Sequence, residues 1–142
     1  MSRAPQLTDA AHAATRIGVA AGILRDKMGR ILLAERRGDA SFPGLWEFPG
    51  GKIGAAESVE AALLRELREE LGIEISAFKH LLSVDHDYGD RCVRLYFYMV
   101  TGWRGELRGV LGQHLRWVSL NEMDATELLP ADVAVIDALR RL

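Results

Sequence analysis

One segment limits the folds open to this chain more than any other: the run SVEAALLRELREELG at residues 58–72. Ser58 can cap the N-terminus of a helix and Gly72 can end one in the left-handed conformation, so the run predicts a helix over residues 59–71. Its leucines recur on one side and form an apolar stripe. A helix of this kind has to bury its stripe, and strands around it would supply the surface.

The segments before the helix have strand and loop character. The apolar runs at residues 17–24 and 31–37 are separated by RDKMGR, which contains Gly29, and this pattern predicts a hairpin. Residues 38–57 contain two prolines and five glycines, too many for a helix, so we expect a shaped loop. Within that loop, residues 45–48 are the only strand-like piece.

The segments after the helix complete the expected domain. Residues 78–87 and 91–101 are rich in β-branched and aromatic residues and flank the turn-like DYGD, so they should pair as strands. Residues 114–118 form a further short strand, and the spacing of apolar positions in residues 132–142 predicts a closing amphipathic helix. This order predicts an α+β domain, an α/β/α sandwich with a mixed β-sheet between helices.

Composition narrows the class of protein. The chain has 142 residues, 49% of them hydrophobic and 27% charged, which fits one globular domain over residues 15–142 after a flexible N-terminal leader at residues 1–14. The net charge of -2 gives no basic excess for binding a nucleic acid polymer. No apolar run reaches the roughly 18 residues of a membrane helix, and the single cysteine, Cys92, cannot form an intrachain disulfide. We therefore expect a cytoplasmic protein that binds no membrane; its oligomeric state is not predicted.

Three carboxylates share one face of the expected helix. Glu66, Glu69 and Glu70 fall within an arc of about 100°. Like charges at this spacing oppose the helix by a few tenths of a kcal/mol per pair, which favours a role in binding divalent cations. Oxygen ligands suit Mg²⁺, with Mn²⁺ as a substitute. The alternative is that these are ordinary solvated glutamates, as most glutamate pairs on helices are.

The residues around the acidic face decide between these alternatives. The pattern G-x5-E-x7-R-E-U-x-E-E-x-G-U, with U an aliphatic residue, is matched at every specified position by Gly51, Glu57, Arg65, Glu66, Leu67, Glu69, Glu70, Gly72 and Ile73. This pattern resembles the Nudix box. From about residue 17 to 142 the chain is similar to the MutT branch, through ERRGD, LWEFPGGKI, the aromatic strand and the closing LLPAD segment. The resemblance implies a Nudix fold and cleavage of nucleoside triphosphates to monophosphate and pyrophosphate, by attack of water on the β-phosphorus.

The resemblance assigns metal binding to the acidic face. Glu69 and Glu70 match direct ligands, and Glu66 matches either a ligand or the base that takes a proton from the attacking water. The family also uses a backbone carbonyl at the position of Gly50 as a ligand. Gly50 and Gly51 suit this place because no side chain blocks the approach of a metal or phosphate.

Other positions are assigned to bracing and to the nucleotide. Arg65, which we group with the catalytic residues, pairs in the family with the first acid of the box, here Glu57, although its angle on the helix points away from the acidic arc. Gly51 and Glu57 would brace the loop against the helix. Four positions match contacts to the nucleotide: Arg37, Phe48, Arg91 and Asp132. By their chemistry, Phe48 could stack on a base or belong to the core, and Arg91 could be a turn charge.

This chain departs from the branch at two positions. The MutT sanitiser of oxidised guanine has Asn where Asp132 stands, and an ionised Asp can only accept hydrogen bonds. Asp here is similar to members that act on CTP and modified pyrimidine nucleotides, whereas a buried, protonated Asp could still bind 8-oxoguanine. Leu111 stands where the branch has an acid, so one supplementary metal ligand is missing. Its substitute could be Asp87, Asp90 or Glu106.

Together these features predict a Mg²⁺-dependent nucleoside triphosphate pyrophosphohydrolase. We expect hydrolysis of 8-oxo-dGTP to 8-oxo-dGMP and pyrophosphate, a nucleotide-pool sanitation that would serve DNA repair and replication fidelity. The alternative is a pyrophosphohydrolase of CTP or a modified pyrimidine nucleotide. A dinucleoside polyphosphate hydrolase, suggested by Tyr88, and a noncatalytic nucleotide-binding domain are less favoured, the latter because the box carboxylates are intact.

Overall fold

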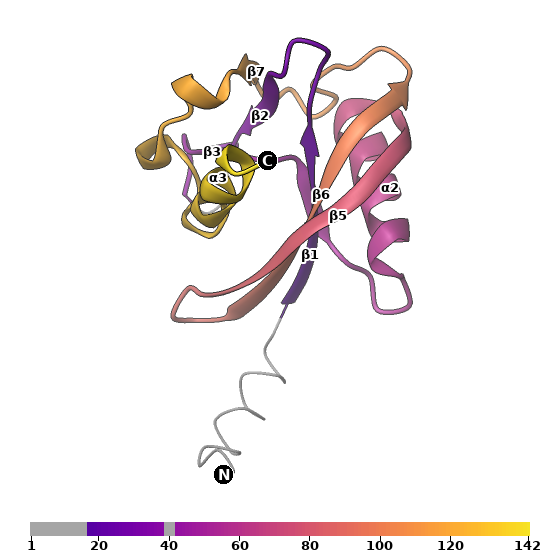
Figure 1. The fold of residues 1–142 in the computed structure, drawn as a ribbon. Helices are drawn as coiled ribbons and strands as arrows, with labels where there is room; N and C mark the ends of the chain where they lie inside the picture. The colour runs from indigo at the N-terminus through magenta and orange to yellow at the C-terminus, as the bar shows by residue number, and fades with distance from the viewer. Residues whose placement is uncertain (1–16, 39–41) are drawn as a thin grey trace.

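The computed structural model describes residues 17–38 and 42–142, so the leader expected at residues 1–14 lies outside the described residues. In the described part of the chain, no helix has the length and apolar character needed to cross a membrane. The strands and helices occur in the following order along the chain (Figure 1): β1 (Ile17–Leu24), β2 (Ile31–Glu35), β3 (Trp46–Glu47), β4 (Gly50–Lys52), α2 (Val59–Leu71), β5 (Glu74–Asp87), β6 (Cys92–Arg104), β7 (Leu115–Val118) and α3 (Val133–Arg140). Three short 3₁₀ turns, at Leu120–Glu122, Ala125–Glu127 and Pro130–Asp132, lie between β7 and α3.

The strands form two sheets. The larger one has the order β4-β1-β6-β5, with β1 parallel to β6 and the other pairs antiparallel. The smaller one has the order β3-β2-β7 and is antiparallel throughout. The mixed sheet expected from the sequence is therefore confirmed, but three strands leave it to form a second sheet.

The expected hairpin between the first two strands is wrong except at its tip. β1 and β2 are joined only by an isolated bridge between Arg25 and Ile31, next to the turn in which the Asp26 N–H donates to the carbonyl of Arg30. The reason is that a strand has two edges, and both edges of β1 are taken, one by β4 and one by β6. β2 consequently diverges and pairs with β3 and β7.

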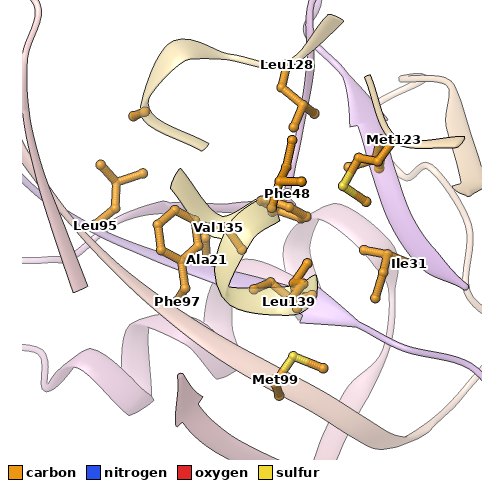
Figure 2. Packing of buried hydrophobic residues seen from close by; sticks show 14 of the residues in the cluster. Ala21, Ile31, Phe48, Leu95, Phe97, Met99, Met123, Leu128, Val135 and Leu139 are labelled. Carbon is orange, nitrogen blue, oxygen red and sulfur yellow. The ribbon is translucent and has the colours of Figure 1, made fainter. Parts of the chain in front are cut away.

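Helices cover both faces of the larger sheet, which confirms the α/β/α sandwich (Figure 1). Successive side chains of a strand point to opposite faces of the sheet, so the apolar residues of these strands cover both faces. Phe97 and Met99 point to the side of α3, whereas Tyr98 and Val100 point to the side of α2. Figure 2 shows the apolar cluster on the α3 side of the sheet, in which Phe97 lies near the side chains of α3.

The acidic helix has the predicted limits. The Ser58 hydroxyl accepts a hydrogen bond from the Ala61 N–H at 3.1 Å, and Gly72 ends α2 with a φ of 71°. The closing helix is shorter than the predicted 132–142, because α3 begins at Val133 after the 3₁₀ turn Pro130–Asp132. This turn places Asp132 just before α3, where it is buried.

One strand lies where the sequence predicted only loop. Residues Gly50–Lys52 pair with β1, with Gly51 opposite Ala20 and Gly50 opposite Ala21. A Cβ at Gly50 would lie 2.1 Å from the carbonyl oxygen of Ala20, so the close approach of the two backbones requires glycine. β4 in turn packs beside α2 and brings the glycines to the acidic face of that helix.

Candidate active site

The acidic face of α2 meets the glycine strand at Glu66. A Cβ on Gly51 would lie 2.3 Å from the carboxyl group of Glu66, so this carboxylate sits directly against the Gly51 backbone. The helix presents Glu66 and Glu70 on the same side, one turn apart. The glycine strand and the acidic helix therefore form one continuous surface of backbone and carboxylate groups.

Glu70 is the most perturbed carboxyl group of this surface. Its side chain is half-buried, shares a hydrogen bond with Glu66 and lies near the charge of Glu47. Burial first, and then the contact with Glu66, raise the pKa of Glu70 to about 9, against a hydrogen bond from the Gly50 backbone. Two carboxyl groups that share a proton in this way are a fitting donor set for a divalent cation, which would replace the proton and neutralise the pair.

Arg65 connects the acidic face to the preceding loop. Its Nε donates to Glu57 Oε2 at 2.6 Å and its second terminal nitrogen to Oε1 at 2.8 Å. The expected pairing with Glu57 is thus present, and hydrogen bonds from Arg65 and from the Gly54 N–H lower the pKa of Glu57 to about 2. Arg65 does not point away from the acidic arc, however, because its other terminal nitrogen reaches Glu66 at 2.9 Å and Glu69 at 3.2 Å.

The remaining candidate carboxylate ligand, Glu69, does not cluster with Glu66 and Glu70. The Glu69 side chain is 56% exposed and forms an ion pair with Arg65. Within residues 17–38 and 42–142, no three His, Cys, Asp or Glu side chains form a ready metal cluster. The groups that fit a hard cation are therefore the carboxylates of Glu66 and Glu70, which contact each other. The Gly50 backbone lies beside this pair, and Glu69 is on the adjoining surface.

The loop after β6 is attached to the end of the acidic helix. The Glu70 carbonyl accepts hydrogen bonds from Val110 N at 3.0 Å and from Gln113 Nε2 at 3.1 Å. Leu111 is half-exposed in this loop and supplies no side-chain oxygen. Of the three acids considered as substitutes, Asp87 and Asp90 lie at the β5–β6 turn, and Glu106 is exposed just after β6.

A cavity of about 200 Å³ adjoins the glycine strand. It is lined by residues of β1, β3, β4, the β5–β6 turn and the segment before α3, among them Phe48, Tyr88, Arg91 and Asp132. Phe48 is buried and packs edge-to-face on Phe97 at 5.9 Å, so this residue belongs both to the core and to the cavity wall (Figure 2). The structure thus brings together three of the four residues expected to contact a nucleotide.

Within the described part of the chain, Asp132 is the one buried residue with a carboxylic or basic side chain, and 2% of its surface is exposed. Its Oδ2 accepts a hydrogen bond from the Phe48 N–H at 3.1 Å. Burial, aided by the charge of Glu47, raises the pKa of Asp132 to about 8, although the Phe48 N–H and Arg36 act in the opposite direction. At neutral pH the side chain is therefore mostly a neutral acid, which offers both a donor and an acceptor.

The structure places Arg36 in the cavity wall, whereas the sequence favoured Arg37. Arg36 donates to Glu47 Oε1 at 2.8 Å and lines the cavity. Arg37 is exposed and lines a neighbouring groove with Glu70 and Leu111. Residues two apart in a strand share a face, and Ala34 pairs with Glu47, so this strand register brings Arg36 rather than Arg37 to the side of Glu47. Glu47 itself was missed, although the sequence places it in the strand-like piece at residues 45–48.

Comparisons with known proteins agree with this geometry. The NUDIX domain profile matches residues 15–139. The chain is 38% identical over 127 residues to an 8-oxo-dGTP diphosphatase of Escherichia coli strain K12, covering 89% of this chain and 98% of that relative. It is 41% identical over 124 residues to a CTP pyrophosphohydrolase of the same strain, covering 87% and 90%.

Solved structures give the same result for the fold. A MutT NUDIX hydrolase from Burkholderia pseudomallei matches with a TM-score of 0.75 at 31% identity, covering 89% of this chain and 98% of that one. The E. coli ORF135 protein matches with a TM-score of 0.78 at 38% identity, covering 90% and 91%. The residues that surround the cavity and the acidic helix lie within residues 15–139, the part of the chain that the NUDIX domain profile matches.

Proposed function

This chain belongs to the NUDIX domain family, and on that premise we propose that it hydrolyses 8-oxo-dGTP to 8-oxo-dGMP and pyrophosphate. The observation that carries the choice of base is Asp132, a buried neutral acid in the wall of the cavity next to the glycine strand. A relative that covers most of this chain is an 8-oxo-dGTP diphosphatase, which supports the same substrate. The role would be sanitation of the nucleotide pool.

The phosphates would lie over the glycine strand and the acidic helix. Glu66, Glu69 and Glu70, with the Gly50 carbonyl, are the groups that would hold Mg²⁺, or Mn²⁺ in its place. When bound, such a cation neutralises phosphate charge and makes a coordinated water more acidic. Gly51 lets the Glu66 carboxylate lie directly against the glycine strand, because a Cβ at this position would collide with that carboxylate.

The side chains of Glu66 and Arg65 would then activate the water that attacks the triphosphate. Glu66 would accept the proton of the attacking water, and Arg65 orients this carboxylate through the bond at 2.9 Å. Water attacks the β-phosphorus, the bond from that phosphorus to the oxygen bridging to the α-phosphorus breaks, and the nucleoside monophosphate leaves. Glu57 accepts two hydrogen bonds from the other side of Arg65, so Glu57, Arg65 and Glu66 form one hydrogen-bonded unit.

The base would enter the cavity that Phe48 and Asp132 line. Guanine presents two acceptors, N7 and O6, along one edge, whereas oxidation at C8 places a hydrogen on N7. A neutral Asp132 can donate from Oδ1 to O6 and accept from N7–H with Oδ2, which already accepts from Phe48 N–H. Unoxidised guanine would leave an acceptor facing an acceptor, and an unpaired buried group is penalised strongly. Arg36 and Arg91, both in the cavity wall, would contact the sugar, the base or the first phosphate.

A second substrate class is favoured by a separate observation. A CTP pyrophosphohydrolase is 41% identical to this chain over 124 residues. In its ionised form Asp132 would accept a hydrogen bond from the exocyclic amine of cytosine. The two functions therefore differ in the protonation state that each one needs, and activity on cytidine nucleotides should increase relative to activity on 8-oxo-dGTP as the pH rises above about 8.

The test is a steady-state comparison of kcat/KM for 8-oxo-dGTP, dGTP, CTP and 5-methyl-dCTP with Mg²⁺, with pyrophosphate and phosphate measured separately. We expect a preference of about 100-fold for 8-oxo-dGTP over dGTP, equal to about 2.7 kcal/mol, with release of pyrophosphate. A preference for cytidine nucleotides would establish the second class. If the wild-type protein turned over none of these nucleotides, the enzymatic assignment would fail.

A variant pair tests the acidic face in the same assay. Glu70→Gln should lose at least about 100-fold in kcat, because it removes a carboxylate from the expected cation site. Glu60→Gln is the matched control, since Glu60 is on the same helix but is exposed and bonded to the Tyr98 hydroxyl. Equal activity of the two variants would contradict the assignment of Glu70.

A further inference from the structure

We infer that the hydroxyl group of Tyr88 is a positioning group that holds Asp132 for recognition of the base, by joining the two walls of the cavity. The inference rests on the proposed function, because it concerns how the base is selected. Tyr88 lies in the β5–β6 turn and lines the same cavity as Asp132. Its hydroxyl accepts a hydrogen bond from the Ala131 N–H at 3.2 Å, and Ala131 is the residue just before Asp132.

Other attachments of the segment that carries Asp132 run to β3 and the residue after it. Leu128 forms a parallel bridge with Trp46, and the Leu129 N–H donates to the Trp46 carbonyl at 2.8 Å. The third attachment is the bond from the Phe48 N–H to Asp132. All three run to β3 and the residue after it, whereas the Tyr88 hydroxyl bonds the segment to the β5–β6 turn, on the side where the 3₁₀ turn packs against β5.

The Tyr88 hydroxyl also fills a gap at the start of the 3₁₀ turn Pro130–Asp132. The first N–H groups of a helical turn have no partner inside it. Leu129, at the cap position, has no side-chain acceptor, and Pro130 has no N–H, so Ala131 is the first residue with a donor to satisfy. Tyr88 supplies the acceptor from 43 residues away. The Asp132 N–H then bonds to the Leu129 carbonyl at 2.8 Å, so the cap directly precedes Asp132.

The Tyr88 ring has supports that do not involve its hydroxyl. Phe42 lies 5.5 Å and His86 4.4 Å from it between ring centroids, and the Arg91 guanidinium lies 5.8 Å above it. A phenylalanine at this position keeps all three contacts. The variant Tyr88→Phe therefore removes the cross-link between the walls and leaves the shape of the cavity in place.

A matched pair of variants tests the inference. Tyr98→Phe is the control, because the Tyr98 hydroxyl also makes one side-chain hydrogen bond, to Glu60 at 2.8 Å, but on the face of the sheet that α2 covers. With Tyr88→Phe we expect KM for 8-oxo-dGTP to rise about tenfold and the preference over dGTP to fall about tenfold, the effect of one lost hydrogen bond. We expect kcat to stay within about twofold, since the acidic helix is not altered. Tyr98→Phe should keep the wild-type preference.

Coupling to Asp132 separates positioning from a general effect on the fold. In the background of Asp132→Ala, Tyr88→Phe should reduce the preference for 8-oxo-dGTP no further, because the group that it positions is gone. If the two substitutions instead reduce the preference independently, Tyr88 does not act through Asp132 and the inference is wrong. An equal loss of kcat for every nucleotide with unchanged preference would also overturn it.

Amide hydrogen exchange gives a readout that does not depend on turnover. In Tyr88→Phe the Ala131 N–H should exchange about tenfold faster than in Tyr98→Phe, because its acceptor is removed. An unchanged exchange rate would refute the cap. If the wild-type protein hydrolysed no nucleotide but exchange at Ala131 still increased, the proposed function would fail while the attachment of the segment by Tyr88 would stand.

Discussion

At the scale of single residues, burial decides the chemistry of Asp132. Its pKa is about 8 in the folded protein, above the ordinary value of 3.8 for an aspartic acid side chain. A raised folded pKa stabilises the fold fully below pH 4, and this contribution is lost as the pH rises towards 8. The carboxyl group therefore serves as a neutral donor in the pH range in which its ordinary counterparts are charged.

We predict that Asp132→Asn removes this pH dependence. Between pH 4 and 8 the wild-type free energy of unfolding should fall relative to that of the variant, by up to about 1.4 kcal/mol per pH unit. In the wild type, KM for 8-oxo-dGTP should rise above pH 8, whereas the variant, whose amide keeps a donor and an acceptor, should show a flat KM. Urea unfolding and steady-state kinetics from pH 5 to 9 measure both effects. Parallel curves for the two proteins would show that Asp132 is ionised throughout.

The brace between Arg65 and Glu57 gives a second prediction at this scale. Glu57→Gln should lower kcat/KM by about tenfold, because Arg65 would then hold Glu66 less firmly. The control is Glu74→Gln, which weakens a comparable two-point pair with Arg68 on the same helix. That pair is exposed and its loss should leave kcat/KM unchanged. Equal effects of the two substitutions would mean that the pairing with Glu57 has no special role in turnover.

At the scale of elements, the short strand β4 sets the distance between glycine backbone and acidic helix. Gly51→Ala would place a methyl group 2.3 Å from the Glu66 carboxyl carbon and oxygen, so the strand or the carboxylate must move. We predict a loss of at least about 100-fold in kcat, because small displacements at a reacting centre have effects of this size. Gly38→Ala is the control, since among the described residues no atom other than those of its chain neighbours lies within 4 Å of its Cβ position. Retention of wild-type kcat by Gly51→Ala would contradict the close approach.

The elements also differ in how well the sequence predicts them. The limits of α2 could be predicted because its two caps, Ser58 and Gly72, are local signals. β4 could not, because the run GGK has no side-chain pattern and forms a strand only through its pairing with β1. The divergence of β2 from β1 has the same origin, since it depends on which strands occupy the edges of β1. Pairing between distant segments leaves little trace in either partner alone.

In the candidate site, too, local features could be predicted from the sequence, whereas contacts between distant segments could not. The shared face of Glu66 and Glu70 follows from the spacing of residues along one helix, and the pairing of Arg65 with Glu57 was expected from the resemblance to the Nudix box. The contact of Asp132 with the Phe48 backbone joins residues 84 positions apart, and neither its burial nor its raised pKa could be read from the sequence. The choice of Arg36 over Arg37 likewise depends on strand register, which the sequence left open.

At the scale of the whole molecule, the acidic face places a strain on the fold that a cation should relieve. We predict that Mg²⁺ at 100 times its Kd raises the free energy of unfolding by about 2.7 kcal/mol relative to the protein in a chelator. Glu70→Gln should abolish this increase and should be at least as stable as the wild type without Mg²⁺, because an amide can donate to Glu66 in place of the shared proton. Urea unfolding with and without Mg²⁺ measures these changes.

The variant Glu60→Gln provides the comparison for that experiment. Glu60 lies in the first turn of α2 and is bonded to Tyr98, so its loss should leave the stabilisation by Mg²⁺ intact. A stabilisation that survives in Glu70→Gln would show that the cation binds elsewhere.

The parallel pair of β1 and β6 also affects how this protein is made on the ribosome. Ile17 and Val93 are partners in that pair, about 75 residues apart, so at ~5–20 residues per second β1 emerges roughly 4–15 s before its neighbour. A nascent chain that stops short of β6 already contains every glutamate of the acidic helix, yet one edge of β1 is still unpaired. During this interval the apolar strand is open to pairing with other chains, which makes the nascent chain prone to aggregation. Competence for hydrolysis is therefore acquired late in translation.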